Sequence, residues 1–284
     1  MVNVIWILEN IKKHSSFYTE LKVNLLITSA IQWKKHNPNT NTVLYCDKMT
    51  YELFESIKVL HLWNEVNIYK HERKINRSVF WAASKLNVLA EQTEPVLLLD
   101  NDSLVHTNID EYLKDEVIVS NFEIGKGYYP SSLDTNIRNL TYKARWKSDS
   151  VNVSFLYLPD PTFTQEYAKL SLKLMEEFTV MEVPNSQYLI FAEQLLLKHL
   201  LDKNNIKHKS VISTYWDCQK WDWSEDHNKG IWNYPESNKY FFHYGPLKGY
   251  IKAETGDLDY QKEIDMLENC IGFRILDESI FSKR

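Results

Sequence analysis

Residues 96–99 (VLLL), followed by Asp100-Asn101-Asp102, constrain the fold of this chain more than any other stretch. Four apolar residues in succession, introduced by Pro95, predict a short strand buried on both faces, as in a parallel sheet covered by helices. Ligands of open α/β sheets bind at the carboxyl ends of such strands. The sequence therefore places two carboxylates, at positions i and i+2, at a predicted ligand-binding edge.

Strand and helix patterns alternate along the chain, which predicts a doubly wound, mostly parallel sheet flanked by helices. The expected strands cover residues 2–8, 42–46, 65–69, 96–99, 151–157 and 240–243. The expected helices cover 21–33, a stretch from Tyr51 to Ile57 capped by Thr50, 78–90, 161–177, 187–201 and 258–270. Residues 121–150 are expected to form a long loop insertion near the site. No linker or repeat divides the chain, so residues 1–284 are expected to form one domain.

Composition limits the partners and the compartment. The net charge of −5 argues against nucleic acid as the main partner. The three cysteines are widely spaced and form no CxxC pair, which indicates a reducing compartment. No basic leader precedes the first expected strand, and no apolar run is long enough to span a bilayer. We therefore expect a cytoplasmic protein without a transmembrane segment.

The aspartate pair is the strongest candidate for a metal site. In a strand, residues i and i+2 point to the same face, so Asp100 and Asp102 could reach one ion. Carboxylate oxygens are the ligands that hard divalent cations prefer. The alternative is a solvated turn after a strand, with acids that bind nothing.

A second candidate is the segment from His243 to Lys248, which follows the last expected strand. An imidazole at a strand end can bind a metal. Gly245 would allow close approach of the backbone, and Lys248 could meet phosphate oxygens. The alternative is a structural histidine in an ordinary loop.

Polar residues on two expected helices form a third group. Glu193 and Gln194 could bind sugar hydroxyls, and Glu193 could act as a base or an electrostatic stabiliser. Lys85 could reach a phosphate or sugar. The alternatives are an acid favoured by a helix N-terminus and a solvated lysine.

Four of the nine tryptophans lie within residues 216–232. Trp216, Trp221 and Trp223 have polar neighbours and could stack on sugar faces. They could equally form a satellite core under a long loop.

Taken in order, these motifs resemble those of GT-A fold glycosyltransferases, and within them family 8, which includes glycogenin and bacterial lipooligosaccharide galactosyltransferases. The resemblance runs over residues 80–250. It is carried by Lys85, Asp100-Asn101-Asp102, the strand 151–155 with Asn152, Glu193-Gln194, and His243 to Lys248. Three departures occur: the His-to-Lys segment is one residue short, glutamate replaces aspartate at 193, and serine replaces glycine at 154.

The resemblance implies a retaining, metal-dependent transfer of a sugar from a nucleotide-diphosphate donor, usually a UDP-sugar, to a carbohydrate or glycoconjugate acceptor. It implies Mn²⁺ or Mg²⁺ held by Asp100, Asp102 and His243. It further implies that Gly245 and Lys248 contact the diphosphate, and that Lys85, Asn152, Glu193 and Gln194 surround the donor sugar. Residues 1–120 would then be the nucleotide-binding half. Residues 121–284 would form the acceptor-binding half with a C-terminal helical extension.

Two other functions remain open from the residues alone. An apolar strand before Asp-x-Asp also opens haloacid-dehalogenase-type phosphatases, with Asp100 as the nucleophile. A non-catalytic carbohydrate-binding protein on a transferase fold is the other, because fold does not fix function. The sequence names neither the sugar donor nor the acceptor.

Overall fold

The computed structural model describes residues 2–9, 16–70, 73–125, 128–130, 133–147, 149–218, 220, 222–224, 230–232 and 240–243. The chain forms two compact units, each assembled from segments that are distant in sequence. The N-terminal unit comprises Asn3–Tyr69, Leu99–Glu111 and Tyr234–Arg284. The central unit comprises Met1–Val2, Lys70–Leu98 and Tyr112–Asn233.

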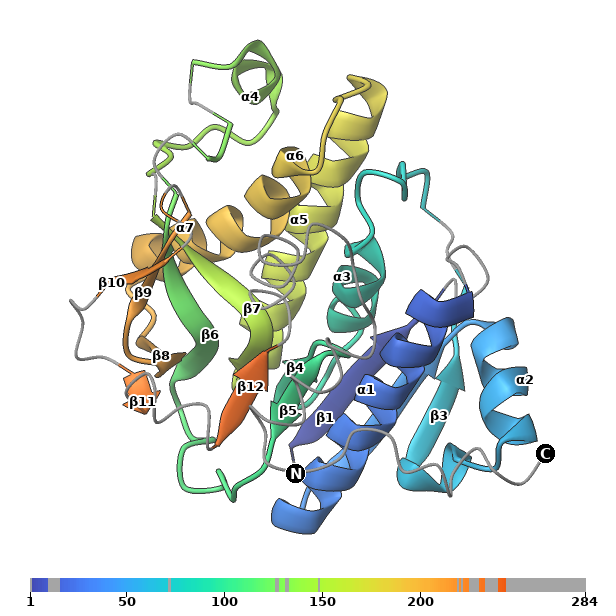
Figure 1. Ribbon diagram of the computed structural model, residues 1–284. Coiled ribbons are helices and arrows are strands. Elements are labelled where there is room, and N and C mark those ends of the chain that lie inside the picture. The colour runs from blue at the N-terminus through green and yellow to red at the C-terminus, as the bar shows by residue number, and fades with distance from the viewer. Residues whose placement is uncertain are drawn as a thin grey trace. The chain divides into compact units, whose positions relative to one another are not determined.

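The N-terminal unit is built on three parallel strands, β1 (Asn3–Leu8), β2 (Asn41–Cys46) and β3 (Glu65–Ile68), in the order β1-β2-β3 (Figure 1). Helix α1 (Ser16–His36) connects β1 to β2, and α2 (Lys48–Ser56) with the short turn η2 (Leu60–Leu62) connects β2 to β3. The core of this unit contains the indole rings of Trp6 and Trp33, which meet edge to face.

A second, antiparallel pair in the same unit joins β5 (Ser103–Val105) to β12 (Phe241–His243). All three residues of β5 are buried, and α1 packs against this strand. Segments more than 130 positions apart in the sequence thus become neighbours in one ribbon. Since α1 covers β5, the ribbon is fixed within the N-terminal unit.

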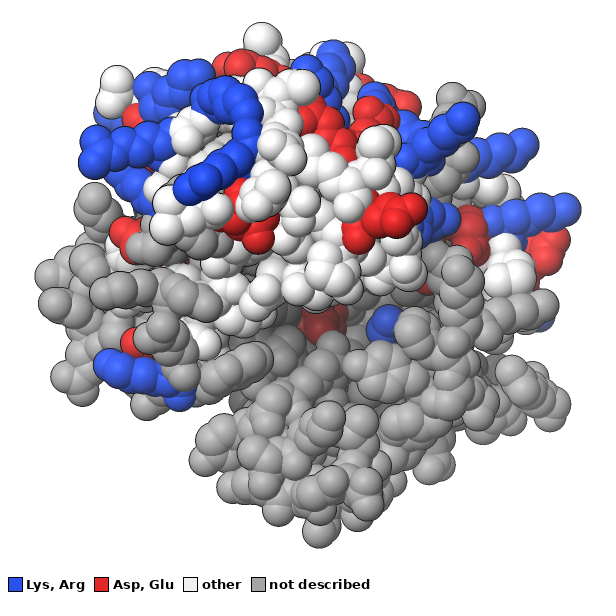
Figure 2. All heavy atoms as spheres, turned by 90° about the horizontal axis from the view of Figure 1, so that it is seen from above, with Lys and Arg blue, Asp and Glu red and all other residues white. Residues whose placement is uncertain are grey.

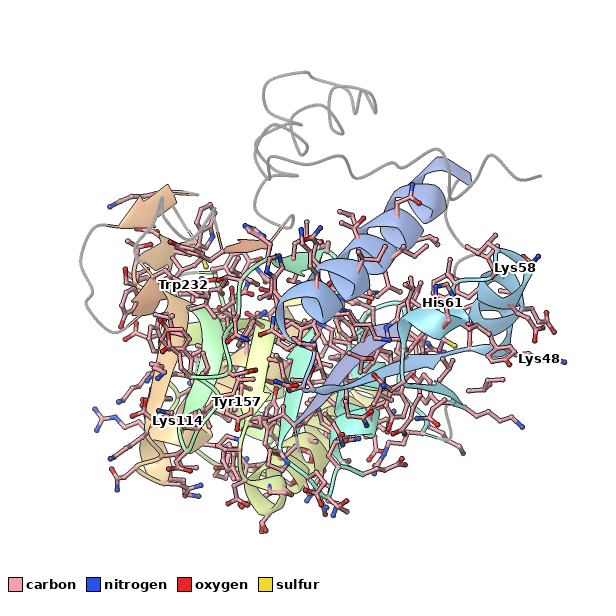
Figure 3. The ribbon with its side chains drawn as sticks, turned by 90° about the horizontal axis from the view of Figure 1, so that it is seen from below. Lys48, Lys58, His61, Lys114, Tyr157 and Trp232 are labelled. Atoms are coloured by element: carbon pink, nitrogen blue, oxygen red, sulfur yellow. The ribbon has the colours of Figure 1, made fainter. Side chains whose placement is uncertain are left out.

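The central unit contains a mixed sheet with the order β10-β9-β6-β7-β4, and β8 and β11 lie off this path. Its strands are β4 (Val96–Leu99), β6 (Val117–Ile124), β7 (Asp149–Leu158), β8 (His208–Ile212), β9 (Tyr215–Asp217), β10 (Asp222–Ser224) and β11 (Gly230–Trp232). β6 pairs antiparallel with β7, with a bulge between Val119 and Asn121, and parallel with β8 and β9. The loop before β6 is fixed by Tyr157 of β7, whose hydroxyl donates to the Lys114 carbonyl at 3.0 Å (Figure 3).

The described helices of the central unit are α3 (Ala83–Leu89), α4 (Thr135–Asn139), α5 (Pro161–Val180), α6 (Gln187–Ile190), the π-helical turn η3 (Phe191–Leu195) and α7 (Leu196–Lys203). Of these, α5, η3 and α7 pack against β7. Figure 1 shows α5, α6 and α7 together behind β6 and β7, and α5 packs against α3, β7, η3 and α7. Pro161 suits the first turn of α5, and the Asp160 carboxylate caps it by accepting from the Thr162 N–H.

The predicted α/β class is confirmed: the strand pairs are mostly parallel and helices pack on the sheets. Three local predictions were wrong. Asp47, not Thr50, caps α2, because the Asp47 carboxylate accepts from both the N–H and the hydroxyl of Thr50. The helix expected from residue 78 begins at Ala83, because the Asn76 side chain accepts from Ser78 and holds a turn there.

The third wrong prediction was the long loop over residues 121–150. β6 continues to Ile124, α4 occupies Thr135–Asn139, and β7 begins at Asp149. Asn121 and Glu123 gave β6 a polar appearance, although both side chains are buried. The helix expected at 258–270 lies outside the described residues.

Candidate functional site

Asp100 and Asp102 lie on a tight turn between β4 and β5, in the segment that belongs to the N-terminal unit. The Ser103 N–H donates to the Asp100 carbonyl at 3.0 Å, the i+3 to i bond of a β-turn. The expectation that both carboxylates project from an extended strand was therefore wrong, because β4 ends at Leu99. Both acids are partly exposed, unlike the fully buried strand before them.

The residue between the two acids anchors this turn. The Asn101 amide Nδ2 donates to the Ile7 carbonyl of β1 at 2.8 Å. Ile7 is the next-to-last residue of β1, so the turn is tied to the carboxyl end of that strand. The sequence Asp-Asn-Asp thus combines two acids that face outward in part with one amide that fixes their backbone.

β12 brings His243 to this turn. In the antiparallel β5–β12 register, the backbone of His243 lies opposite Ser103, the residue directly after Asp102. The ladder continues where the His106 N–H donates to the Tyr240 carbonyl at 3.0 Å. Directly opposed residues of such a pair have Cα atoms about 4.5–5.5 Å apart. The backbone of the predicted histidine ligand therefore neighbours the aspartate pair.

A buried chain of hydrogen bonds supports β5 from beneath. The Trp6 Nε1–H donates to Ser29 Oγ at 2.9 Å, and the Ser29 hydroxyl donates to the Ser103 carbonyl at 2.7 Å. Trp6, Ser29 and Ser103 are all fully buried. Because buried hydrogen bonds are costly to lose, these two hydrogen bonds fix the position of Ser103, where the turn and β12 meet.

The central unit contains a different acid, Glu123 of β6, which the sequence reading did not single out. Its side chain is 7% exposed and accepts hydrogen bonds from several directions. Asn152 Nδ2 donates to Oε1 at 3.0 Å, and the Tyr129 hydroxyl donates to Oε2 at 2.7 Å. The Cys218 thiol donates to Oε2 at 3.9 Å. The available signal was Glu123 beside Phe122 and Ile124, after the apolar run 117–119, since an acid among apolar residues is a candidate for buried polar chemistry.

Gln194 joins the same cluster. With its amide nitrogen facing the acceptors, Gln194 donates to the Val151 carbonyl at 3.2 Å and to Glu123 Oε2 at 3.3 Å. Two residues predicted to surround a donor sugar, Asn152 and Gln194, therefore meet at one carboxyl group. We call Glu123, Tyr129, Asn152, Gln194 and Cys218 the Glu123 cluster.

Gln194 and its neighbour Glu193 lie in the π-helical turn η3, between α6 and α7. Such turns are rare and occur often at functional sites. Glu193 is 5% exposed, and its backbone carbonyl accepts from the Tyr167 hydroxyl at 3.1 Å. Burial, and then the charge of Glu193, raises the pKa of Tyr167 well above its usual value, so this hydroxyl remains a donor.

Burial also governs the proton affinities inside the Glu123 cluster. It raises the pKa of Glu123, although the hydrogen bonds from Asn152, Tyr129 and Cys218 oppose that shift. Burial raises the pKa of Cys218 to about 12, and the nearby Glu123 contributes. The thiol is therefore protonated and donates, and it is not a nucleophile.

The other predicted residues fall in several places. Lys85 lies on α3 of the central unit and is half-buried. Trp216 of β9 is opposite Trp223 of β10 in their antiparallel register. Trp232, labelled in Figure 3, packs edge to face on the Tyr112 ring, which is a structural contact. Gly245, Lys248 and Trp221 lie outside the described residues.

Two features are absent from the part of the chain that the structure describes. Among the residues whose side chains the structure describes, which do not include His243, no group of three His, Cys, Asp or Glu side chains is arranged to hold a metal ion. The described part also has no helix with the length and apolar character needed to cross a membrane.

Comparison with known proteins gives a family without an assigned role. The model of a family described as "Family of unknown function (DUF6734)" matches residues 1–255. No curated protein gives a significant match to the sequence.

Proposed function

Since the chain belongs to the DUF6734 family, whose function is unknown, we propose from its own residues that it is a metal-dependent glycosyltransferase with a GT-A fold. The donor is a nucleotide-diphosphate sugar, most simply a UDP-sugar, and the acceptor is a carbohydrate or glycoconjugate. One observation carries the proposal: the β5–β12 pairing brings the backbone of His243 next to the turn that holds Asp100 and Asp102. Nothing in the sequence between residues 103 and 243 requires that meeting.

The donor set fits a divalent cation. Two carboxylates and one imidazole are ligands that Mn²⁺ accepts, and Mg²⁺ accepts the carboxylates. The proposed ligands are Asp100, Asp102 and His243. When bound, the cation supplies Lewis-acid stabilisation of the negative charge on the leaving diphosphate. The hydrogen bond from Asn101 to Ile7 keeps the backbone of the two acids in place for that role.

In the central unit, we assign Asn152 and Gln194 to the donor sugar. Amide groups can donate to and accept from sugar hydroxyls, provided that their orientation is fixed. Glu123 fixes both by accepting from their amide nitrogens, so each amide oxygen is oriented away from the carboxyl group. In this proposal Glu123 is a positioning residue. Glu193, next to Gln194 in η3, contributes negative charge near the sugar. The paired positions of Trp216 and Trp223 remain candidates for acceptor stacking.

A thermal-shift screen of nucleotide sugars, with and without Mn²⁺, tests the proposal. A ligand at about a hundred times its Kd adds roughly 2.7 kcal/mol to the free energy of unfolding. We expect an increase in melting temperature that requires both the metal and the diphosphate. This increase should disappear in the Asp102→Asn variant. If free sugars raise the melting temperature of the wild type without metal, the protein is a carbohydrate-binding protein instead. If no nucleotide-diphosphate sugar shifts the transition in Mn²⁺, the proposal fails.

A further inference from the structure

Three large apolar side chains of the central unit stand far out of the surface. Val180 is 84% exposed, Leu133 is 71% exposed and Trp81 is 57% exposed. Val180 is the last residue of α5, while the other two come from loops far away in sequence. Scattered single apolar residues need no explanation, so the question is whether these three share one surface.

Contacts with the last two turns of α5 join the three positions. The Phe80 ring, beside Trp81, stacks on Phe178, and their centroids are 6.2 Å apart. The Tyr188 ring also packs on Phe178, at 5.0 Å, and the Tyr188 hydroxyl donates to the Asp134 carboxylate at 3.0 Å.

Two further hydrogen bonds connect loop residues to the same end of α5. The Asn76 N–H donates to Thr179 Oγ1 at 2.9 Å, and the Thr141 N–H donates to Glu177 Oε2 at 2.7 Å. Segments 73–81, 133–147 and 176–182 therefore form one surface, which we call the α5 end surface. The three exposed apolar side chains, Trp81, Leu133 and Val180, each come from one of these joined segments.

The same surface carries a run of cations. Between residues 138 and 147 there are four basic residues and no acid. From 141 to 147 exposed and half-buried residues alternate, with Lys143, Arg145 and Lys147 on the exposed side. Trp146 is on the inner side, where its ring packs against Phe191 at 4.6 Å. In an extended segment alternate side chains share a side, so the three cations lie on the outer side, where the Lys143 ammonium also donates to the Arg138 carbonyl.

The charge balance of this surface is opposite to that of the whole chain. Its three segments contain seven Lys or Arg against four Asp or Glu, whereas the chain has a net charge of −5. Three of the four acids are engaged: Glu176 with Arg73, Glu177 with Thr141, and Asp134 with Tyr188. Lys147 is also paired, with Asp202 at 3.4 Å, but its side chain remains 72% exposed. Figure 2 shows that Lys and Arg side chains are interspersed with Asp and Glu on the face of the molecule seen from above.

We propose that the α5 end surface binds a membrane surface that contains anionic lipid. Lys and Arg near a bilayer are attracted by lipid phosphates, and aliphatic and Trp side chains enter the interfacial layer. A nucleic acid would satisfy the cations but would give Val180 and Leu133 no apolar environment. The combination of outward cations and outward apolar side chains therefore favours lipid, and the protein lies on the bilayer without crossing it. This inference is independent of the proposed function.

Co-sedimentation of the full chain with vesicles tests it. The wild type should pellet with phosphatidylcholine vesicles that contain phosphatidylglycerol, and should remain in the supernatant with phosphatidylcholine alone. Neutralising three cations, in Lys143→Gln/Arg145→Gln/Lys147→Gln, should weaken binding roughly a hundredfold, because each contributes about a fivefold factor. The matched control, Lys35→Gln/Lys48→Gln/Lys114→Gln, changes the net charge equally at three separate exposed positions and should bind as the wild type does.

A second variant tests the apolar part. Leu133→Ser/Val180→Ser leaves every charge in place and should weaken binding about tenfold or more. Circular dichroism and the melting temperature verify that each variant is folded. The proposal is overturned if the wild type does not pellet with anionic vesicles, or if the lysine control loses as much binding as the triple variant. It is also overturned if the apolar variant is unaffected while duplex DNA binds as tightly as the vesicles.

Discussion

The turn after β4 and the Glu123 cluster both present carboxyl groups, in opposite settings. Asp100 and Asp102 are partly exposed at the end of a strand, and Asn101 fixes their backbone through the Ile7 carbonyl. Glu123 lies inside a strand, is almost fully buried and accepts from side chains of β7, η3 and two loops. An acid at an exposed turn can meet an ion from solution. An acid enclosed by donors acts mainly on its own neighbours.

The largest expected difference between the two regions is in metal-dependent binding. Asp102→Ala should weaken UDP binding in Mn²⁺ by more than about a hundredfold, because it removes a proposed metal ligand and not merely a supporting contact. Calorimetric titration of UDP, with and without Mn²⁺, measures this. Asp110→Ala, which removes an exposed acid from the same unit, is the control and should bind normally. Unchanged UDP affinity in Asp102→Ala would remove that residue from the metal site.

The free energy of unfolding should depend more on Glu123 than on Asp102, which is the reverse of metal-dependent binding. Glu123→Ala should lower the free energy of unfolding by about 3 kcal/mol, because it leaves several buried donors without an acceptor. Asp102→Ala should change it by less than about 1 kcal/mol, since the Ser103–Asp100 bond of the turn is between backbone atoms. Urea unfolding of both variants makes the comparison. Equal losses of stability would show that the two acids do not differ as described.

The buried acid also predicts how stability depends on pH. Because burial raises the pKa of Glu123 in the folded state, the protonated form is favoured there. The contribution of protonated Glu123 to the free energy of unfolding is complete below pH 4.5, the pKa of the unfolded chain. This contribution declines as the pH rises through the higher pKa of the folded state. The loss is about 1.4 kcal/mol for each unit of pKa difference. Melting temperatures measured against pH should therefore fall in the wild type relative to Glu123→Gln, and parallel curves would contradict the shift.

The smallest expected change in the free energy of unfolding comes from Asp202, an acid of the central unit that has lysine partners. Asp202 contacts Lys198 at 2.5 Å and Lys147 at 3.4 Å, and these lysines lower its pKa against the opposing effect of burial. Its contribution is present above the unfolded value of 3.8 and is lost as the pH falls through the folded pKa. Asp202→Asn should cost less than about 1 kcal/mol at neutral pH. A loss as large as that of Glu123→Ala would mean that burial is not what separates these acids.

Much of the secondary structure could be predicted because its signals are local. The apolar run at 96–99 and the alternation after residue 150 correspond to β4 and β7. Ser78 was a poor predictor of a helix start, because its hydroxyl donates to the Asn76 side chain and the Phe80 N–H donates to the Asn76 carbonyl, so Ser78 does not cap a helix. β6 was missed because polar residues in its second half have buried hydrogen-bond partners that a linear pattern does not reveal.

The α/β class, the acids that follow β4, and the residues able to bind a metal or sugar hydroxyls could all be inferred from the amino-acid sequence. These follow from periodicity and side-chain chemistry, which are properties of short segments. The tertiary structure was needed to show that the backbone of His243 neighbours the aspartate turn and that Asn152 and Gln194 share Glu123. It was also needed to show that two distant segments, 73–81 and 133–147, meet at the end of α5. Each of these depends on strand register or on packing between distant segments, and local patterns do not encode such distances.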